Sequence, residues 1–349
     1  MARSDHASSD RITGLVLGAA VGDALGLPAE GMSAARIARR WPGELRHRLV
    51  FGDGMVSDDT EHLFFTGQSL LEAGDDVVQF RQRLARRLRW WLLALPAGVG
   101  SATARSIAKL WLGWSPAKSG VWSAGNGPAM RSAIIGARFT HDHEHLHAFV
   151  EASTFMTHRD PKALTGALAV ALGAAALVKG EMDEAPLMTA WGTLSDDEEW
   201  QRALATMRSE LGRGASVACF SEALGGKREV SGYIYRTVPV ALYAWLRHRG
   251  DFRATMQEVI ACGGDTDTVA AIAGSLAGAE CGTDGIPAEW LHGICEWPCG
   301  IAQWRELAQR IANPICREPV RYVTAGVLPR NVLFLGIVLM HGIRRLLPG

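Results

Sequence analysis

Apolar residues recur at helical spacing along nearly the whole chain. Leu84, Leu88 and Trp91, for example, fall at positions i, i+4 and i+7, and arginines occupy most of the positions between them. This spacing is typical of amphipathic helices. Alternation of the kind expected for strands is rare, and the best stretch, 48–56, is short. The pattern therefore predicts an all-α protein whose helices are separated by breaks at glycine and proline.

Two of the predicted helices are rich in small residues. In the first, glycine recurs at every fourth position from Gly14 to Gly26, and these glycines share one face. In the second, 270–279, Gly274 and Gly278 have the same spacing. Each glycine costs about 1 kcal/mol relative to alanine inside a helix, so this pattern is expected where a close approach compensates for it. We expect two central helices that pack backbone to backbone.

Length and composition favour one large helical domain over other classes of protein. The chain has 349 residues, 36 basic and 36 acidic side chains, and an apolar fraction of 48%. The balanced charge argues against a strongly basic nucleic-acid binder, and the apolar share excludes a largely disordered chain. The length allows two domains, but only the acidic stretch 181–199 offers a linker, and no internal repeat is visible. We predict a single domain over 1–349, built as a many-helix bundle, with a flexible N-terminus (1–11) and a C-terminal extension (319–349).

The cysteines and two apolar runs bear on where the protein works. Cys295 and Cys299 lack the second pair of ligands that a zinc site needs, so the cysteines are predicted to be buried, reduced thiols. Acids flank the run 12–20, which argues against a secretion signal and for a cytoplasmic protein. The run 332–340 is well short of the ~18–20 residues that span a bilayer. We expect no membrane span and interpret this run as a core-docked terminal helix, with an interfacial anchor as the alternative.

Clusters of acids and hydroxyls stand at the starts of two predicted buried helices, Ser57-Asp-Asp-Thr60 and Gly264-Asp-Thr-Asp-Thr268. A single Asp, Ser or Thr is an ordinary helix N-cap, but each of these starts offers two carboxylates and a hydroxyl. Buried carboxylates are rare unless they are paired or bound to metal. Carboxylate and hydroxyl oxygens suit Mg²⁺ or Mn²⁺ rather than zinc. Facing each other, the two clusters can hold two ions ~3.5–4 Å apart, the usual spacing in binuclear hydrolases.

A glycine-rich stretch, 123–131 (SAGNGPAMR), is a third candidate element. Its glycines allow a ligand to approach the backbone closely, and its N–H groups can cradle phosphates before a helix begins. A plain turn is the alternative interpretation.

Taken in order, these motifs resemble the ADP-ribosylglycohydrolase family, which includes the dinitrogenase-reductase-activating glycohydrolases. The resemblance extends over about 12–282, and Ser231-Gly232-Tyr233 is a weaker match within it. Five matches carry it: Gly14-x-x-x-Gly18-x-x-x-Gly22-Asp23-Ala24 with Glu30, Ser57-Asp-Asp-Thr60, Gly125-Asn-Gly with Met130-Arg131, Thr157-His158 with Asp160, and Gly264-Asp-Thr-Asp-Thr268.

The resemblance implies an all-α orthogonal bundle with two Mg²⁺ ions (or Mn²⁺) in a central cleft. It implies hydrolysis of the bond between C1 of the distal ribose of ADP-ribose and an acceptor. That acceptor is a protein side chain in the first interpretation, and a small conjugate or a nucleic-acid end are alternatives. The metal ligands implied are Ser57, Asp58 and Asp59 in one group and Asp265, Asp267 and Thr268 in the other. The catalytic candidates are Glu30, Asp59 and Asp267. The substrate-binding candidates are Ser123, Ala124, Gly125, Asn126, Gly127 and His158, with Tyr233 as a weaker one.

One position departs from the family pattern. After Ser-Asp-Asp-Thr the family commonly has Glu or Gln followed by Met, whereas this chain has Glu61 and His62. His62 lies one helical turn from the implied ligands, and we favour a packing role over a role beside the metals. A non-catalytic ADP-ribose-binding, immunity or structural protein on the same scaffold is the alternative function, and hydrolysis of another phosphorylated ribose is a third. The acceptor and the oligomeric state stay open.

Overall fold

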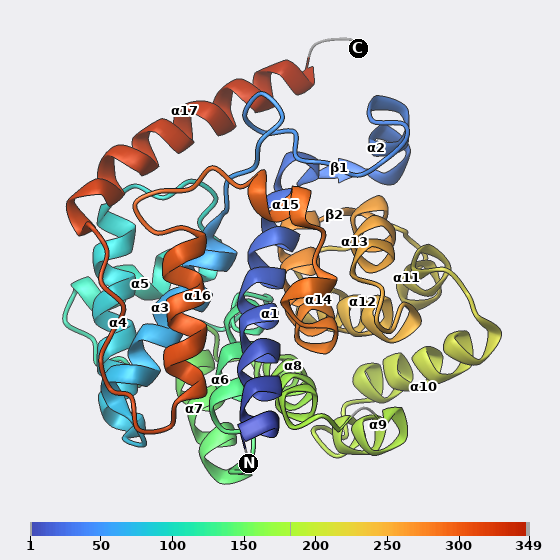
Figure 1. The fold of residues 1–349 in the computed structure, drawn as a ribbon. Helices are drawn as coiled ribbons and strands as arrows, with labels where there is room; N and C mark the ends of the chain where they lie inside the picture. The colour runs from blue at the N-terminus through green and yellow to red at the C-terminus, as the bar shows by residue number, and fades with distance from the viewer. Residues whose placement is uncertain (1, 182, 347–349) are drawn as a thin grey trace.

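Two antiparallel helices run through the middle of the molecule, and the other helices pack around them (Figure 1). The computed structural model describes residues 2–181 and 183–346. The elements are α1 (Ala2–Gly26), β1 (Met32–Ser33), α2 (Ala34–Arg40), α3 (Asp58–Ala73), α4 (Val77–Leu93), α5 (Ser101–Trp111), α6 (Ala133–Arg138), α7 (His143–Phe155), α8 (Pro161–Lys179), α9 (Glu184–Gly192), α10 (Glu198–Arg213), α11 (Val217–Gly225), α12 (Ile234–Arg247), α13 (Phe252–Ala261), β2 (Gly263–Gly264), α14 (Thr266–Cys281), α15 (Ala288–His292), α16 (Ile301–Ala312) and α17 (Val327–Leu346). Four 3-10 turns complete the set, at Leu27–Ala29, Ala129–Arg131, Thr283–Gly285 and Thr324–Gly326. The predicted all-α class is confirmed.

The central pair is α1 and α14, which touch through the glycines that the sequence singled out. A Cβ placed on Gly18 would lie 2.2 Å from the carbonyl oxygen of Gly274, and one on Gly14 would lie 2.1 Å from that of Gly278. No side chain fits at such distances, so only glycine allows the two backbones to approach this closely. The predicted packing of two small-residue helices is therefore what the structure shows, with the helices antiparallel.

The other predicted helices form because each has one apolar face to bury. In α4, Leu84 and Leu88 are fully buried and Trp91 nearly so, as the spacing predicts. The stretch 48–56 forms only isolated bridges, such as Val50 with Asp53, and the described residues contain a single two-stranded sheet, β1 with β2. The stretch had been the best strand candidate, but it has too few alternating residues to form a ladder.

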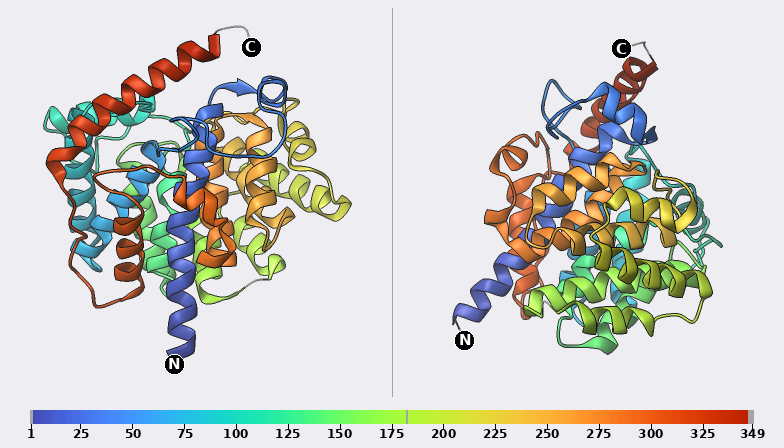
Figure 2. Two further views of the ribbon diagram at one scale, coloured as in Figure 1. Left: turned by 45° about the horizontal axis from the view of Figure 1, so that its top comes forward. Right: turned by 90° about the vertical axis from the view of Figure 1, so that its right-hand side faces the viewer.

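α1 is helical from Ala2, and its first turns extend beyond the bundle (Figure 2). The flexibility predicted for 1–11 stays a prediction. Residue 1 of that segment and 347–349 of the predicted extension lie outside the described residues.

The C-terminal helix α17 lies across one end of the bundle (Figure 2). Among the described residues, three stretches of helix are long and apolar enough to cross a membrane. The most apolar 18-residue window is wholly buried in Ala7–Ala29 and 72% buried in Pro161–Lys179, but only 17% buried in Thr324–Arg345. The predicted core-docked terminal helix was thus wrong in its burial, because the nine-residue apolar run continues as a 20-residue helix that lies on the surface.

Candidate active site

The antiparallel pairing of α1 and α14 brings the end of one helix beside the start of the other. The Thr266 hydroxyl donates a hydrogen bond to the carbonyl of Gly26 at 2.8 Å. Just beyond, the Gly31 N–H donates to the carbonyl of Gly264 at 2.7 Å, and β1 pairs with β2. Glu30 and the acids of α14 therefore meet at one end of the central pair.

Asp23 fixes the start of α3 against this pair. It is fully buried on α1, and its carboxylate accepts hydrogen bonds from the backbone N–H groups of Ser57 and Thr60 and, at 2.6 Å, from the Thr60 hydroxyl. Burial raises the pKa of Asp23 to about 6, although these hydrogen bonds oppose the rise. The sequence analysis placed Asp23 in a motif but gave it no role. The signal in the sequence for a buried role was that Asp23 directly follows Gly22, one of the glycines on the packed face of the helix.

The two predicted ligand groups meet at Asp59. Its Oδ2 lies 3.2 Å from the Ser57 hydroxyl and 3.1 Å from the Thr268 hydroxyl. Its Oδ1 is buried and has no hydrogen-bond partner. A buried carboxylate oxygen without a donor is costly unless a cation neutralises it.

Several carboxyls lie close together at this end of the bundle. Burial raises the pKa values of Asp58, Asp59 and Asp267 well above the ordinary range, and repulsion from neighbouring acids raises them further. Burial also raises the pKa of Glu30, helped by Asp265 and opposed by Arg345. The cluster holds more acid than the protein compensates.

The donor set suits a hard divalent cation, because carboxylate and hydroxyl oxygens are the ligands such ions prefer. Within residues 2–181 and 183–346, no three carboxylate, imidazole or thiolate groups already form a metal cluster. The predicted set mixes hydroxyls with carboxylates, and Asp265 accepts a 2.7 Å hydrogen bond from Asn126. The unpartnered Oδ1 of Asp59 and the uncompensated acids are the observations that fit a metal here.

A cavity of about 350 Å³ lies over the acids. Ten of the predicted site residues line it: Glu30, Asp58, Asp265, Asp267, Thr268, Ser123, Gly125, Asn126, Gly127 and His158. Ser57 and Asp59 are buried and lie outside the lining. Ala124 is also outside it, and its carbonyl accepts the backbone N–H of Ile234.

Tyr233 is the other predicted site residue that does not line this cavity. Its hydroxyl donates to Glu199 at 2.7 Å and accepts from Lys162 at 3.0 Å. Burial raises its pKa to about 12. Only the backbone of Tyr233 reaches the site, through a bridge with Gly125.

The glycine-rich stretch packs against His158. A Cβ on Gly125 would lie 3.0 Å from the His158 ring, and one on Gly127 would lie 3.1 Å from it. Asn126 ties the stretch to its surroundings, since its side-chain N–H₂ group donates to both Asp265 and the Thr237 hydroxyl. Glycine is therefore needed for the imidazole to approach this backbone.

His158 is held by a buried arginine. Arg131 is fully buried and donates to the Thr157 hydroxyl at 2.6 Å, and that hydroxyl lies 2.9 Å from Nδ1 of His158. Burial, with the charge of Arg131, lowers the pKa of His158 to about 3. The imidazole is therefore neutral at physiological pH.

His62 is a packed histidine and does not line the cavity. It is fully buried, its Nδ1 lies 3.3 Å from Nη1 of Arg131, and its ring meets Trp91 edge to face at 4.5 Å. Burial and the charge of Arg131 hold its pKa well below the usual range. The contacts agree with the packing role that the sequence analysis favoured.

Sequence reasoning missed one wall of the cavity. That wall adjoins the glycine-rich stretch, since a Cβ on Gly127 would lie 3.6 Å from the Thr103 hydroxyl. It is formed by the loop before α5 and the first turn of that helix, and its lining residues are Gly98, Gly100, Ser101, Ala102 and Thr103. The signal in the sequence was the break at 96–100, which had been assigned only as a boundary between helices.

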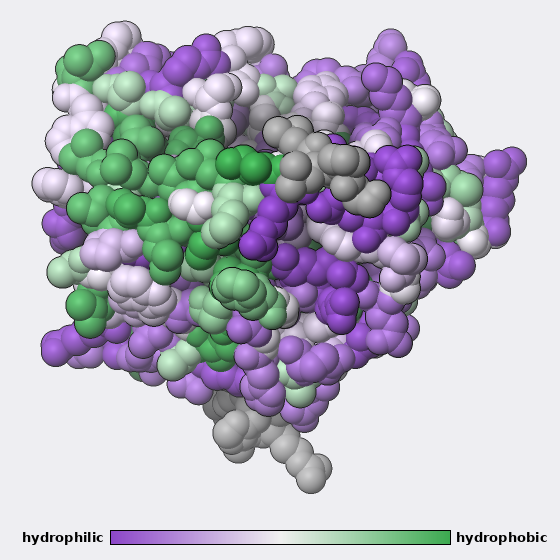
Figure 3. All heavy atoms as spheres, turned by 90° about the horizontal axis from the view of Figure 1, so that it is seen from above, coloured by the Kyte–Doolittle hydropathy of each residue, from purple (hydrophilic) through white to green (hydrophobic). Residues whose placement is uncertain are grey.

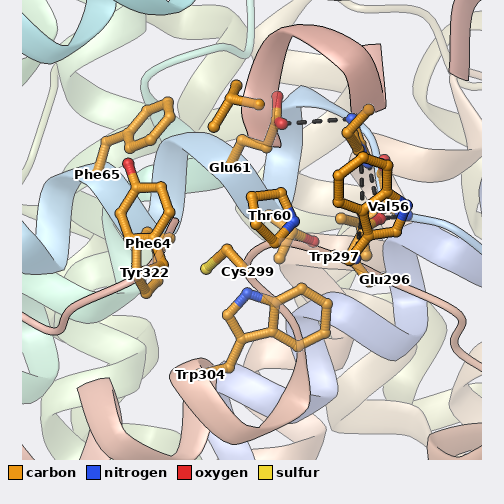
Figure 4. A pocket seen from close by; sticks show the side chains of 13 residues that line it. Val56, Thr60, Glu61, Phe64, Phe65, Glu296, Trp297, Cys299, Trp304 and Tyr322 are labelled. Atoms are coloured by element: carbon orange, nitrogen blue, oxygen red, sulfur yellow. Dashed lines mark hydrogen bonds and ion pairs between the residues drawn. The ribbon is translucent and has the colours of Figure 1, made fainter. Parts of the chain in front are cut away.

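Behind the acids, a small buried compartment of about 40 Å³ connects α3 with the C-terminal helix (Figure 4). Glu61 of α3 accepts from Nε1 of Trp91 at 2.6 Å and pairs with Arg330 of α17 at 3.3 Å. Arg330 also pairs with Glu296 at 2.7 Å and donates to the carbonyl of Val56 at 2.7 Å. Arg330 thus fastens α17 to the residue just before the Ser57 group.

A comparison with known protein families shows to which family this chain belongs. The model of a family described as ADP-ribosylglycohydrolase matches residues 4–319. The chain belongs to the ADP-ribosylglycohydrolase family. The resemblance predicted from the motifs is confirmed, and the chain is a hydrolase of ADP-ribosyl groups.

Proteins from several organisms match this chain over most of its length and most of their own. An uncharacterized protein of Archaeoglobus fulgidus is 32% identical over 323 residues, which are 90% of this chain and 98% of the relative. ADP-ribosyl-[dinitrogen reductase] glycohydrolase of Rhodospirillum rubrum is 32% identical over 295 residues, 81% of this chain and 89% of the relative. ADP-ribosylhydrolase ARH3 of Gallus gallus is 26% identical over 353 residues, 88% of this chain and 94% of the relative. A solved structure described as an ADP-ribosylglycohydrolase-related protein complex has a TM-score of 0.63 and 28% identity, and the match covers 89% of this chain and 99% of that one.

Proposed function

We propose that this family member is a Mg²⁺-dependent hydrolase that releases ADP-ribose from an ADP-ribosylated protein side chain. The observation that carries the proposal is the meeting of the two acid groups at Asp59, beneath a cavity bordered by the glycine-rich stretch. Ser57, Asp58 and Asp59 would hold one ion, and Asp265, Asp267 and Thr268 the other. Mn²⁺ offers the same ligand preferences and is an alternative metal.

A bound pair of such ions supplies positive charge that stabilises the developing negative charge of the reaction and lowers the pKa of water. The protein's own part begins with binding. Ser123, Gly125, Asn126 and Gly127 line the cavity, and a glycine-rich loop of this kind lets a phosphate approach the backbone closely. We assign the diphosphate of ADP-ribose to this loop and the distal ribose to the acids beyond it.

His158 is suited to donate a hydrogen bond to that diphosphate. Arg131 is always a donor, so the Thr157 hydroxyl accepts from it and can give its own hydrogen to Nδ1 of His158. In that arrangement the proton of the neutral imidazole stays on Nε2, which faces Gly125. The low pKa of His158 keeps this state across the physiological range.

Glu30 is the residue placed to hold or move a proton. It lines the mouth of the cavity, and its raised pKa makes protonation easier near neutral pH than for an ordinary glutamate. We also include Asp59 and Asp267 in the proposed catalytic set. Each belongs to one of the two groups of metal ligands, at the place where the two groups lie next to each other.

The test is the release of free ADP-ribose from defined substrates by the purified protein. The substrates are peptides ADP-ribosylated on Arg or Ser, and a nucleic acid with an ADP-ribosylated end. We expect turnover of at least one peptide with Mg²⁺, loss of turnover in EDTA, and recovery when Mg²⁺ or Mn²⁺ is added back. Undiminished turnover in EDTA would contradict the metal assignment. ADP-ribose binding without turnover of any acceptor would favour the non-catalytic alternative.

We also propose that the protein works in the cytoplasm. All six cysteines are free, which suits a reducing compartment, although Cys219 and Cys295 are exposed and not buried as predicted. Activity that is equal with and without a thiol reductant and is lost on oxidation would support this, and a requirement for an oxidising buffer would contradict it.

A further inference from the structure

The C-terminal helix α17 faces solvent with large apolar side chains, whereas the other helices turn their apolar side toward the core. It turns polar side chains inward, where Arg330 and Asn331 are buried beside Phe334. Its outward side carries large apolar side chains that are 39–63% exposed: Val332, Leu333, Leu335, Leu339, Met340 and Ile343. Monomeric soluble proteins rarely expose a contiguous apolar surface of this kind unless it has a partner.

Specific polar contacts hold the helix in this orientation along its length. Besides the ion pairs of Arg330, the side-chain N–H₂ group of Asn331 donates to the carbonyl of Ala94 at 2.9 Å. Near the other end, His341 Nε2 lies 3.0 Å from the carbonyl of Pro28, and Arg345 donates to the carbonyl of Glu30 at 2.6 Å. The outward apolar side is therefore a fixed property of the docked helix.

Neighbouring segments extend the apolar surface. Leu93 and Leu95 flank the Ala94 that Asn331 binds, and both are more than half exposed. Phe51 is 98% exposed and follows Val50, which packs against the cluster that contains Phe334. Seen from above, apolar side chains form one broad area on this face of the molecule, with hydrophilic side chains beside it (Figure 3). We call this area, with its α17 side chains, the apical face.

Positive charge gathers at the C-terminal end of α17. Residues 319–349 contain four arginines and no acid, and residues 34–53 contain five arginines against two acids. The two segments touch, because Arg36 donates to the carbonyl of Arg345 and Arg40 to that of Arg344. Arg39 and Arg46 are exposed in the same region. The apical face is thus bordered by a basic cluster.

We propose that the apical face docks on the surface of a bilayer that contains anionic lipids. A helix that exposes a long apolar side next to arginines is the type that lies in the membrane interface, with apolar side chains among the acyl chains and arginines at the headgroups. Arginines next to an anionic surface strengthen such binding by electrostatic attraction. If two copies of the chain joined through this face, their C-terminal segments, which carry arginines and no acid, would meet. Their like charges would repel each other, which disfavours such a dimer.

The helix lies on the bilayer and does not cross it. Crossing would pull Arg330 and Asn331 away from Glu296 and Ala94 and leave a buried carboxylate unpaired. Because the family match ends at residue 319, α17 is an addition to the catalytic region. Docking would also place the bilayer next to the catalytic cavity, since Arg345 holds the carbonyl of Glu30.

The test is flotation of the full-length protein with vesicles of phosphatidylcholine alone or mixed with 30% phosphatidylglycerol. We expect the wild type to float with the anionic vesicles at least ten times more than with the neutral ones, and less in 1 M salt. The double variant Leu339→Ser/Ile343→Ser should lose at least ten-fold of this binding. Ile315→Ser, which removes an 85% exposed side chain outside the apical face, is the matched control and should bind like the wild type.

The charge arm uses Arg39→Glu/Arg46→Glu, which should bring binding to anionic vesicles close to the neutral level, with Arg202→Glu on α10 as its control. Thermal melting and ADP-ribose release establish that the variants are folded. Absence of vesicle binding, or binding that the Leu339→Ser/Ile343→Ser variant retains, would overturn the proposal. So would resistance to carbonate extraction, which indicates a spanning helix, or a lipid-free dimer that the same variant dissociates, which indicates a second copy on this face.

Discussion

The Thr268 hydroxyl donates a hydrogen bond of 3.1 Å to Oδ2 of Asp59, although the two residues are 209 positions apart in the chain. Thr268 is held in place because α14 packs backbone to backbone against α1, and Asp59 because Asp23 of α1 binds the start of α3. Two acid clusters thus come together through a third helix that contributes neither. The close approach of α1 and α14 is therefore a requirement for the site as well as for the fold.

Replacement of Asp267 by Asn should reduce kcat for ADP-ribose release at least 100-fold, because the amide cannot serve as an anionic ligand or stabilise positive charge. Asp265→Asn should behave alike. Asp251→Asn is the control, since Asp251 is an N-cap of α13 whose role Asn can take over. Turnover is measured by chromatography of free ADP-ribose at saturating Mg²⁺. Normal turnover of both α14 variants would rule out the two-metal proposal.

The acid cluster predicts how stability without metal depends on pH. The pKa of Asp23 is raised by burial from 3.8 to about 6 in the folded chain, and Asp58, Asp59 and Asp267 shift in the same direction. The folded state then binds protons more tightly than the unfolded state, so this contribution to stability is lost as pH rises from about 4 through about 6. A bound cation favours the ionised acids and offsets the loss.

Melting temperatures in EDTA and in Mg²⁺ at pH 5 and pH 7.5 measure this effect. The increase that Mg²⁺ causes should be larger at pH 7.5 than at pH 5. An equal increase at both values would show that the acids do not bind the ion.

Gly18→Ala should destabilise the protein by about 2–3 kcal/mol, because the new methyl group would overlap a backbone carbonyl of α14 that cannot move aside. Gly212→Ala is the matched control. Gly212 also lies in a helix, α10, but nothing stands within 4 Å of its Cβ position. The control should stabilise the protein by about 0.5–1 kcal/mol. Urea unfolding measures both, and equal effects would contradict the close packing.

Asn126→Ala should weaken Mg²⁺ binding by about 10–100-fold, as removal of a partner that orients a metal ligand generally does. Asn126 donates to Asp265 at 2.7 Å and to Thr237 at 3.0 Å. Thr237→Val leaves the contact with Asp265 and removes the second one, together with the hydrogen bond that the Thr237 hydroxyl donates to the carbonyl of Ser231 at 2.8 Å, and should have a smaller effect. Calorimetric titration with Mg²⁺ separates the two, and an unchanged affinity in Asn126→Ala would show that Asp265 is not oriented this way.

Arg330→Met should cost about 3–5 kcal/mol of stability, because it leaves the buried carboxylate of Glu296 without its partner. Arg213→Met removes an ion pair with Glu210 on the surface, where Arg213 is 73% exposed, and should cost at most about 1 kcal/mol. Guanidinium unfolding gives both values. Similar costs for the two would contradict the anchoring role of Arg330.

Local sequence patterns predicted part of this architecture. The four-residue glycine period predicted the α1–α14 contact, because a helix repeats its face at that spacing and only a backbone contact compensates for so many glycines. The order of the motifs predicted the family, which is confirmed. Asp23 was harder to interpret, since its partners at Ser57 and Thr60 are distant in sequence and are mostly backbone N–H groups that no residue pattern shows.

The sequence by itself determined the all-α class, the family and the acids that cluster at helix starts, because these depend on periodicity and on residue type over a few turns. Only the tertiary structure decided that the loop at Gly98 and Gly100 forms a wall of the cavity, that the Tyr233 hydroxyl lies outside it, and that α17 exposes its apolar side. Those features depend on which side of each element meets another part of the chain. A helix can turn either side toward the bundle, and the orientation of α17 follows from the buried ion pair of Arg330 with Glu296, which local sequence does not reveal.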